Sequence, residues 1–198
     1  QSVPLHVILT SLGSRPLNIP IPSYQGMMEL EVKVPCEDLA GLEARLKRMG
    51  ASHIEDLDQI DLYFSHPARD FGSTDEALRL RRENERTVIT YKGPKLDKDT
   101  KLREEIELGV HDLEKMSLVL ERLGFQKVIR IEKKRTVYEL QGIHFCLDRL
   151  PGLGNFVEME WQGEDLDEGK EKIMELKQKL GLVGNERRSY LELLMEKG

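Results

Sequence analysis

The chain has 198 residues, a length that favours one globular domain over two. With 39% hydrophobic and 33% charged residues, it is too apolar for a disordered chain and too charged for a membrane-spanning one. A formal net charge of −6 disfavours a nucleic-acid partner held through its phosphates. The two cysteines, Cys36 and Cys146, match no metal-ligand spacing and no disulfide scaffold, so we expect a cytoplasmic protein.

The first 26 residues differ in composition from the rest of the chain. Arg15 is their only charged residue, and their longest apolar run, Val7 to Leu9, is far shorter than the ~20 residues that cross a bilayer. We therefore expect residues 1–26 to be a poorly ordered extension, either a leader or a segment foreign to the natural chain. A short additional strand is the alternative. Residues 27–198 are expected to form a single domain without a membrane partner.

One pattern, a short strand with alternating acidic and apolar residues before an amphipathic helix, occurs three times. The strands are Glu29 to Lys33, Glu105 to Leu108 and Glu158 to Trp161. After the first two, apolar residues follow at i, i+3, i+7 and i+10, which is the stripe that a helix lays on a core. Asp38 and Asp112 are placed to cap these helices. A glycine is placed to end each of the three, at Gly50, Gly124 and Gly181.

Further strands are expected between these units. They are Ile60 to Phe64, Ala77 to Arg82, Arg86 to Lys92, Val128 to Leu140 in one or two pieces, and Ile143 to Asp148. Short turns with Gly or Pro separate them, so neighbouring strands should pair antiparallel. Seven to nine half-polar strands in one domain predict an α+β fold, in which a closed or nearly closed barrel carries the helices outside.

Charged side chains are concentrated on one face of the predicted strands. The carboxylates of this set are Glu29, Glu31, Glu105, Glu107, Asp148, Glu158 and Glu160. The cations are Lys33, Arg79, Arg81, Lys92, Arg103, Lys133 and Arg135. For one strand alone, a solvated outer face is the simpler interpretation. Across all strands, Glu pairs and Arg pairs with hardly a neutral polar residue favour faces that line an enclosed lumen.

A lumen of this kind predicts a ligand, because desolvation typically costs several kcal/mol per ion and such burial does not serve stability. Arg and Lys recognise phosphate oxygens, Arg with a bidentate fork and Lys as a point charge. Carboxylates hold Mg²⁺ or Mn²⁺, which bridge to phosphate. The two sets in one cavity predict a site for a metal and a polyphosphate.

The strand Glu29-Leu30-Glu31-Val32-Lys33 resembles the ExExK motif of the CYTH superfamily, which has the fold of the triphosphate tunnel metalloenzymes. ExExK alone is weak, and the specificity comes from segments that follow it in order. They include Asp61 to Phe64, Ala77 to Arg81, Tyr91 to Pro94, Arg103 to Glu107, Glu132 to Arg135, Gly152 to Glu158 and Ser189 to Leu194. The sequence is most similar to class IV adenylyl cyclases and their archaeal relatives. This resemblance implies an eight-stranded antiparallel tunnel.

The resemblance also implies roles for individual residues. It implies metal ligands at Glu29, Glu31, Asp148, Glu158 and Glu160. It implies triphosphate contacts in catalysis from Lys33, Arg79, Arg81, Lys92, Lys133 and Arg135. Glu105 and Glu107 either join the ligands or brace the basic residues.

Three functions are compatible with these residues. The first is a class IV adenylyl cyclase that converts ATP to cyclic AMP and pyrophosphate with Mg²⁺ or Mn²⁺. The second is a triphosphatase that hydrolyses the terminal phosphate of tripolyphosphate, a nucleoside triphosphate or thiamine triphosphate. The third is a polyphosphate-binding protein without catalysis. The sequence leaves a monomer and a homodimer equally open, and the segment Tyr190 to Met195 is expected to pack on the barrel mouth, with a dimer contact as the alternative.

Overall fold

The computed structural model of the chain describes residues 30–95 and 103–197. The strands are β1 (Glu31–Pro35), β2 (Ser52–Ser65), β3 (Ala77–Glu83), β4 (Arg86–Lys95), β5 (Arg103–Val110), β6 (Gln126–Leu140), β7 (Ile143–Leu150) and β8 (Gly154–Trp161). The helices are α1 (Leu39–Arg48), α2 (Phe71–Thr74), α3 (Leu113–Arg122), α4 (Leu166–Lys179) and α5 (Tyr190–Met195). The expected extension 1–26 and the ligand candidate Glu29 lie outside these residues.

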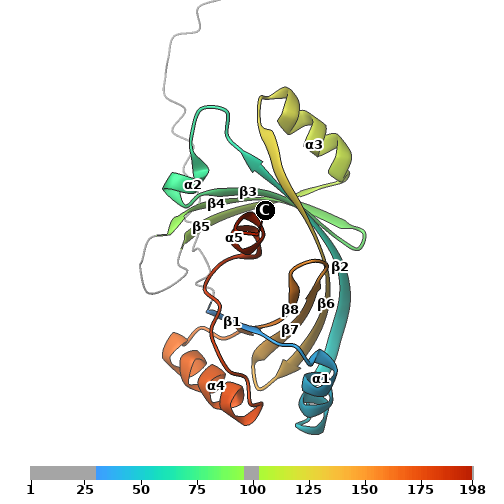
Figure 1. Cartoon of the computed structure of the whole chain (residues 1–198), viewed down its shortest axis with the longest axis vertical. Coiled ribbons are helices and arrows are strands. Elements are labelled where there is room, and N and C mark those ends of the chain that lie inside the picture. The colour runs from blue at the N-terminus through green and yellow to red at the C-terminus, as the bar shows by residue number, and fades with distance from the viewer. Residues whose placement is uncertain (1–29, 96–102, 198) are drawn as a thin grey trace, which may run out of the picture.

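All eight strands belong to one antiparallel sheet, with the order β1-β8-β7-β6-β2-β3-β4-β5. The sheet curls strongly, so that β1 and β8 lie across its hollow from β4 and β5 (Figure 1). The α+β fold with eight antiparallel strands is therefore confirmed. Within the described residues no ladder joins β1 to β5, so hydrogen bonds do not close the ring.

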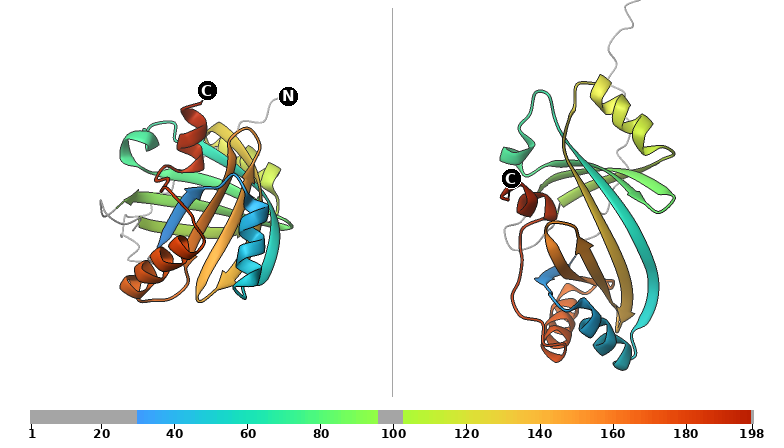
Figure 2. Two further views of the ribbon diagram at one scale, coloured as in Figure 1. Left: turned by 60° about the horizontal axis from the view of Figure 1, so that its bottom comes forward. Right: turned by 45° about the vertical axis from the view of Figure 1, so that its right-hand side comes forward.

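The two longest strands, β2 and β6, lie in the middle of the sheet, between β7 and β3, and pair along almost their whole length (Figure 2). The prediction for β2 was too short, since the strand begins at Ser52 rather than at Ile60. Residues 52–58 are mostly exposed and polar, so they lack the apolar alternation by which a strand is recognised. Backbone pairing with β6 over Lys133 to Glu139 extends the strand there.

Helices α1, α3 and α4 begin and end where the sequence predicts, whereas the short α2 was not predicted. Asp38 accepts a hydrogen bond from the Gly41 amide at the start of α1, and Asp112 accepts one from the Lys115 amide at the start of α3. The three closing glycines have positive φ angles, which side chains with a Cβ disfavour: Gly50 (88°), Gly124 (95°) and Gly181 (66°).

Two apolar clusters hold helices against the outer face of the sheet. The first joins α1 and α4 to strands β1, β6, β7 and β8, with Leu42, Leu46, Phe145 and Leu176 fully buried. The second joins α2 and α3 to β2 and β3 through residues such as Phe71, Leu80 and Leu120. Because apolar side chains on the outside meet the helices, the alternate side chains of the same strands point into the hollow. Among the described residues, no helix is long and apolar enough to span a bilayer.

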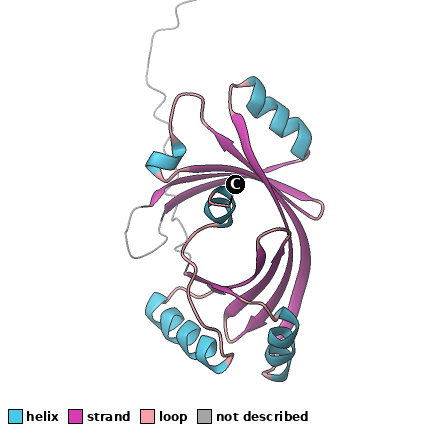
Figure 3. Ribbon diagram, in the orientation of Figure 1, coloured by secondary structure: helices cyan, strands magenta, loops and turns pink. Residues whose placement is uncertain are grey.

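Helix α5 is the exception to this arrangement, because it lies inside the curve of the sheet (Figure 3). Tyr190 and Leu193 pack there against Ile131, Leu150 and Phe156. The expectation that this segment packs on the barrel is confirmed, but its place inside the curve of the sheet was not predicted. The contact also explains why apolar Ile131 shares a face with Lys133 and Arg135.

Candidate functional site

The strand register brings the predicted charged residues together inside the hollow. Glu31 lies opposite Glu160, and Lys33 lies opposite Glu158, across the β1–β8 ladder. Five of the predicted charged residues are buried: Lys33, Lys133, Arg135, Asp148 and Glu158. The prediction that the charged faces are enclosed is confirmed for these five. The other predicted residues with described side chains are half-buried, except Glu107, which is exposed.

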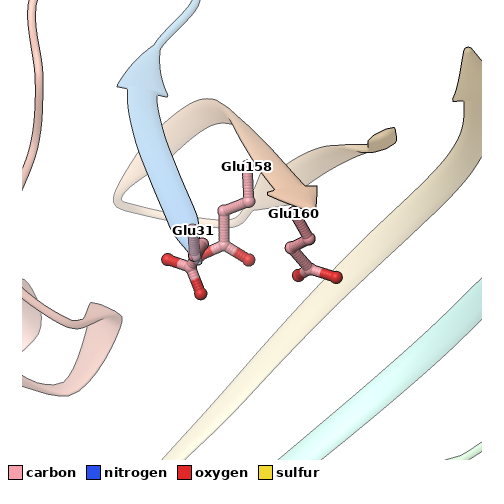
Figure 4. Close-up of side chains that lie close together, drawn as sticks. All are labelled: Glu31, Glu158 and Glu160. Carbon is pink, nitrogen blue, oxygen red and sulfur yellow. The ribbon is translucent and has the colours of Figure 1, made fainter. Parts of the chain in front are cut away.

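Three carboxylates form a compact group at the ends of β1 and β8. One oxygen from each of Glu31, Glu158 and Glu160 lies within 4.8 Å of the other two (Figure 4). Glu158 is buried, whereas Glu31 and Glu160 are half-buried and so face the accessible part of the interior. We call Glu31, Glu158 and Glu160 the carboxylate group. Its oxygen donors are the kind that Mg²⁺ and Mn²⁺ prefer.

Basic residues adjoin the carboxylate group. Arg135 forms ion pairs with Glu158 and, at 3.4 Å, with Glu160, while Lys33 Nζ lies 3.2 Å from Glu158 Oε1. Burial alone would raise the pKa of Glu158, but Arg135, Lys133 and Lys33 outweigh it and hold that pKa far below its usual value. Glu158 is therefore ionised at neutral pH and ready to act as a ligand.

Asp148, a predicted metal ligand, lies among cations and outside the carboxylate group. Arg135 binds it with a bidentate fork, through Nε at 2.7 Å and Nη2 at 2.6 Å. Lys133 Nζ and the hydroxyl of Tyr190 donate to the same Oδ2, at 3.2 and 2.8 Å. The surroundings of Asp148 are those of a residue that orients cations, and its role as a ligand stays a prediction.

The opposite wall, on β3 and β4, carries the remaining predicted cations. Arg79 is held loosely, with Nη2 3.4 Å from Thr90 Oγ1 and 3.9 Å from Glu107 Oε1. Lys92 Nζ lies 2.7 Å from Glu105 Oε1. These contacts agree with the alternative in which Glu105 and Glu107 brace basic residues.

Arg81 is held by a partner that sequence reasoning did not include in the site. The buried carboxylate of Asp61 accepts from its Nε at 2.6 Å and from its Nη2 at 2.7 Å, in a bidentate pair with the half-buried guanidinium group. Sequence reasoning also did not include Tyr190, which contacts Asp148, or Thr90, which contacts Arg79. Asp61 and Tyr190 stood in motif segments that carried the resemblance, but which cations they contact depends on register and on the placement of α5.

Asp61→Asn is expected to destabilise the protein in a pH-dependent way. Burial would raise the pKa of Asp61, but Arg81 outweighs it and lowers that pKa. The pair therefore contributes stability above the unfolded pKa of about 3.9, and this contribution is lost as pH falls through the lower folded pKa. The variant leaves the half-buried Arg81 without its main partner, so the free energy of unfolding should fall by about 3 kcal/mol at pH 7.

Urea unfolding at pH 7 and pH 3 tests this expectation, with Asp58→Asn as the control on the same strand. Asp58 is exposed and lies 3.8 Å from exposed Lys134, so its replacement should change stability by less than ~1 kcal/mol. The difference in the free energy of unfolding between Asp61→Asn and the unsubstituted protein should be smaller at pH 3 than at pH 7. An equal difference at both pH values would contradict the ion pair between Asp61 and Arg81 as its cause.

Comparison with known proteins places this chain in a family. The CYTH domain matches residues 27–190. A Methanocaldococcus jannaschii protein, named provisionally as an adenylate cyclase, is 41% identical over 172 residues, which cover 84% of this chain and 98% of the relative. Adenylate cyclase CyaB of Aeromonas hydrophila is 26% identical over 178 residues, with 86% and 90% of the two chains covered.

A solved structure with the same fold also matches this chain. A Pyrococcus horikoshii protein has a TM-score of 0.75 and 38% identity, and the match covers 86% of this chain and 99% of that protein. Because the CYTH domain accounts for most of the chain and the fold is shared, the chain belongs to the CYTH family.

Proposed function

We propose that the chain is a metal-dependent enzyme that binds a nucleoside triphosphate inside the curled sheet and converts ATP to cyclic AMP and pyrophosphate. One observation carries the proposal: the carboxylate group adjoins a buried set of cations, Lys33, Lys133 and Arg135. Metal ligands and phosphate-binding groups in one enclosed interior suit a ligand that carries both a divalent ion and several phosphates.

The residues present fit Mg²⁺ or Mn²⁺ as the cofactor. The carboxylate group offers only oxygen donors, the ligands of hard divalent ions, and two of its members face the accessible interior. Glu31, Glu158 and Glu160 would hold the ion, with Glu29 and Asp148 as further candidates. Bound there, such an ion acts as a Lewis acid that lowers the pKa of an attacking hydroxyl group.

The cations would hold the phosphates and stabilise the charge that grows on them during the reaction. Lys33, Lys133, Arg135, Arg79, Arg81 and Lys92 are the candidates for this role. In cyclisation, a bond forms between the ribose 3′ oxygen and the α-phosphorus while the bond to pyrophosphate breaks. Positive groups fixed around the phosphates stabilise that transition state more than water does.

Arg79 provides the best evidence that an anion completes the interior. Its Nε is buried and has no hydrogen-bond partner among the described residues, while its Nη2 makes long contacts to Thr90 and Glu107. A buried donor without a partner typically costs about 1–3 kcal/mol, and a phosphate oxygen of the substrate would remove that cost.

The names of the relatives support cyclisation as the reaction. The provisional name of the M. jannaschii protein and the name of the A. hydrophila protein both give adenylate cyclase. The residues that hold a triphosphate do not themselves select the nucleophile, so the products decide between cyclisation and hydrolysis.

A product assay tests the proposal. The protein is incubated with ATP and Mg²⁺ or Mn²⁺, and nucleotides are separated from phosphates by chromatography. We expect cyclic AMP and pyrophosphate in equal amounts, and no turnover in EDTA. Exclusive formation of ADP and orthophosphate would assign the chain as a triphosphatase. Tight binding of ATP without any product would assign it as a binding protein.

A further inference from the structure

We propose that Tyr190 is a positioning residue for the triphosphate, because its ring sets the places of Lys33 and Lys133 without adding a negative charge beside them. The inference rests on the proposed function, in which these two lysines contact phosphate. It assigns a role in the site to α5, which is distant in sequence from every strand that lines the interior.

The side chain of Tyr190 contacts three charged groups of the interior at once. Lys33 Nζ lies over the ring, 4.1 Å from its centroid, and Lys133 Nζ lies 5.0 Å from the same centroid. The hydroxyl donates to Asp148 Oδ2 at 2.8 Å. All three partners are buried, so these contacts are made away from bulk water.

The backbone around Tyr190 fixes its place. Ser189 caps α5 and exchanges hydrogen bonds with Glu192 in a capping box. Just before the helix, the carbonyl oxygen of Arg188 accepts a hydrogen bond from Lys33 Nζ at 3.0 Å, and the Glu186 amide donates to the Lys33 carbonyl at 2.8 Å. The ring also meets Phe156 edge to face, with 5.3 Å between centroids. The chain just before Tyr190 is thus bound to the strand that carries Lys33.

An aromatic ring suits this task better than another carboxylate would. Lys33 already pairs with Glu158 and Lys133 with Asp148, each at 3.2 Å. The face of a tyrosine ring attracts the ammonium group through its quadrupole and carries no net charge. Tyr190 therefore holds the two lysines in place without adding a further negative charge to the two that they already face.

The expected consequence is weaker triphosphate binding when the ring is removed. In Tyr190→Leu, the dissociation constant for inorganic tripolyphosphate should rise about tenfold or more, since two lysines that the ring no longer holds must lose side-chain freedom when the ligand binds. In Tyr190→Phe the ring remains, and the rise should stay below about threefold. Titration calorimetry in EDTA measures both without turnover.

Tyr138→Phe is the matched control. Tyr138 also donates to a carboxylate, that of Glu43, and a lysine also lies over its ring, with Lys47 Nζ at 5.6 Å. It belongs to the apolar cluster outside the sheet, so its replacement should leave tripolyphosphate binding unchanged. Thermal melting of each variant without ligand shows which are folded, and Tyr190→Met repeats the test with another side-chain shape if Tyr190→Leu does not fold.

The binding results distinguish a failure of the role of Tyr190 from a failure of the proposed function on which it rests. A folded Leu or Met variant that binds tripolyphosphate as tightly as the unsubstituted protein would overturn the role of Tyr190 alone. Equal losses in the Phe and Leu variants would also overturn it, because the ring would then not be what matters. If the unsubstituted protein itself fails to bind in EDTA, its cations do not hold tripolyphosphate without a metal ion and the inference fails, whereas the product assay still decides the proposed function.

Discussion

Arg135→Met should lower the melting temperature by about 10 °C, the largest loss of stability that we expect from any single interior change. Arg135 pairs with three carboxylates, those of Asp148, Glu158 and Glu160, and its side chain is 9% exposed. Its removal leaves buried negative charges without their main partner, which typically costs about 3–5 kcal/mol. Calorimetric melting of the purified variant measures the change.

The control is Arg130→Met on the same strand. Arg130 pairs with Glu132, and the two side chains are 46% and 57% exposed, so solvent screens the pair and its loss should change stability by less than ~1 kcal/mol. Equal melting temperatures in the two variants would show that the interior pairs contribute no more than surface pairs. Arg135→Met should also lose tripolyphosphate binding, whereas Arg130→Met should retain it.

The enclosed charged face could be predicted because strand geometry allows few alternatives. Once Leu30, Val32 and Val34 are assigned to the face that meets helices, Glu31 and Lys33 must point the other way. The same alternation placed Glu158 and Arg135 inside. Helix limits could be predicted for a similarly local reason, since Asp38 and Gly50 determine them by their own chemistry.

The pairing of individual charges could not be predicted, because it depends on contacts distant in sequence. Asp148 carries the same charge as Glu158, yet the register places it opposite Arg135, and Lys133 and Tyr190 complete its surroundings. Nothing in the local sequence distinguishes a carboxylate that joins a metal group from one that orients cations. The position of α5 inside the curve is equally non-local, since its apolar residues suit a barrel mouth or a dimer contact alike.

Glu31→Gln should abolish most metal-dependent turnover and leave the fold largely intact. On the proposed function, Glu31 is one of three ligands, and replacing its charged oxygen by a neutral amide weakens the site for a divalent ion. We expect a loss of about a hundredfold or more in the rate of ATP turnover and a weaker affinity for Mn²⁺, measured by electron paramagnetic resonance titration. Because Glu31 is half-buried near the rim, the melting temperature should change by only a few degrees.

Glu132→Gln is the control for charge, because Glu132 is an exposed carboxylate paired with Arg130 on the same sheet. It should retain full turnover and the Mn²⁺ affinity of the unsubstituted protein. The two variants remove the same charge from the protein, so a difference between them reflects position and not net charge. If Glu31→Gln keeps its Mn²⁺ affinity but loses turnover, then Glu31 acts on the substrate rather than on the ion. If it keeps both, the carboxylate group is not the metal site, and Asp148 with Glu158 becomes the alternative ligand pair to test.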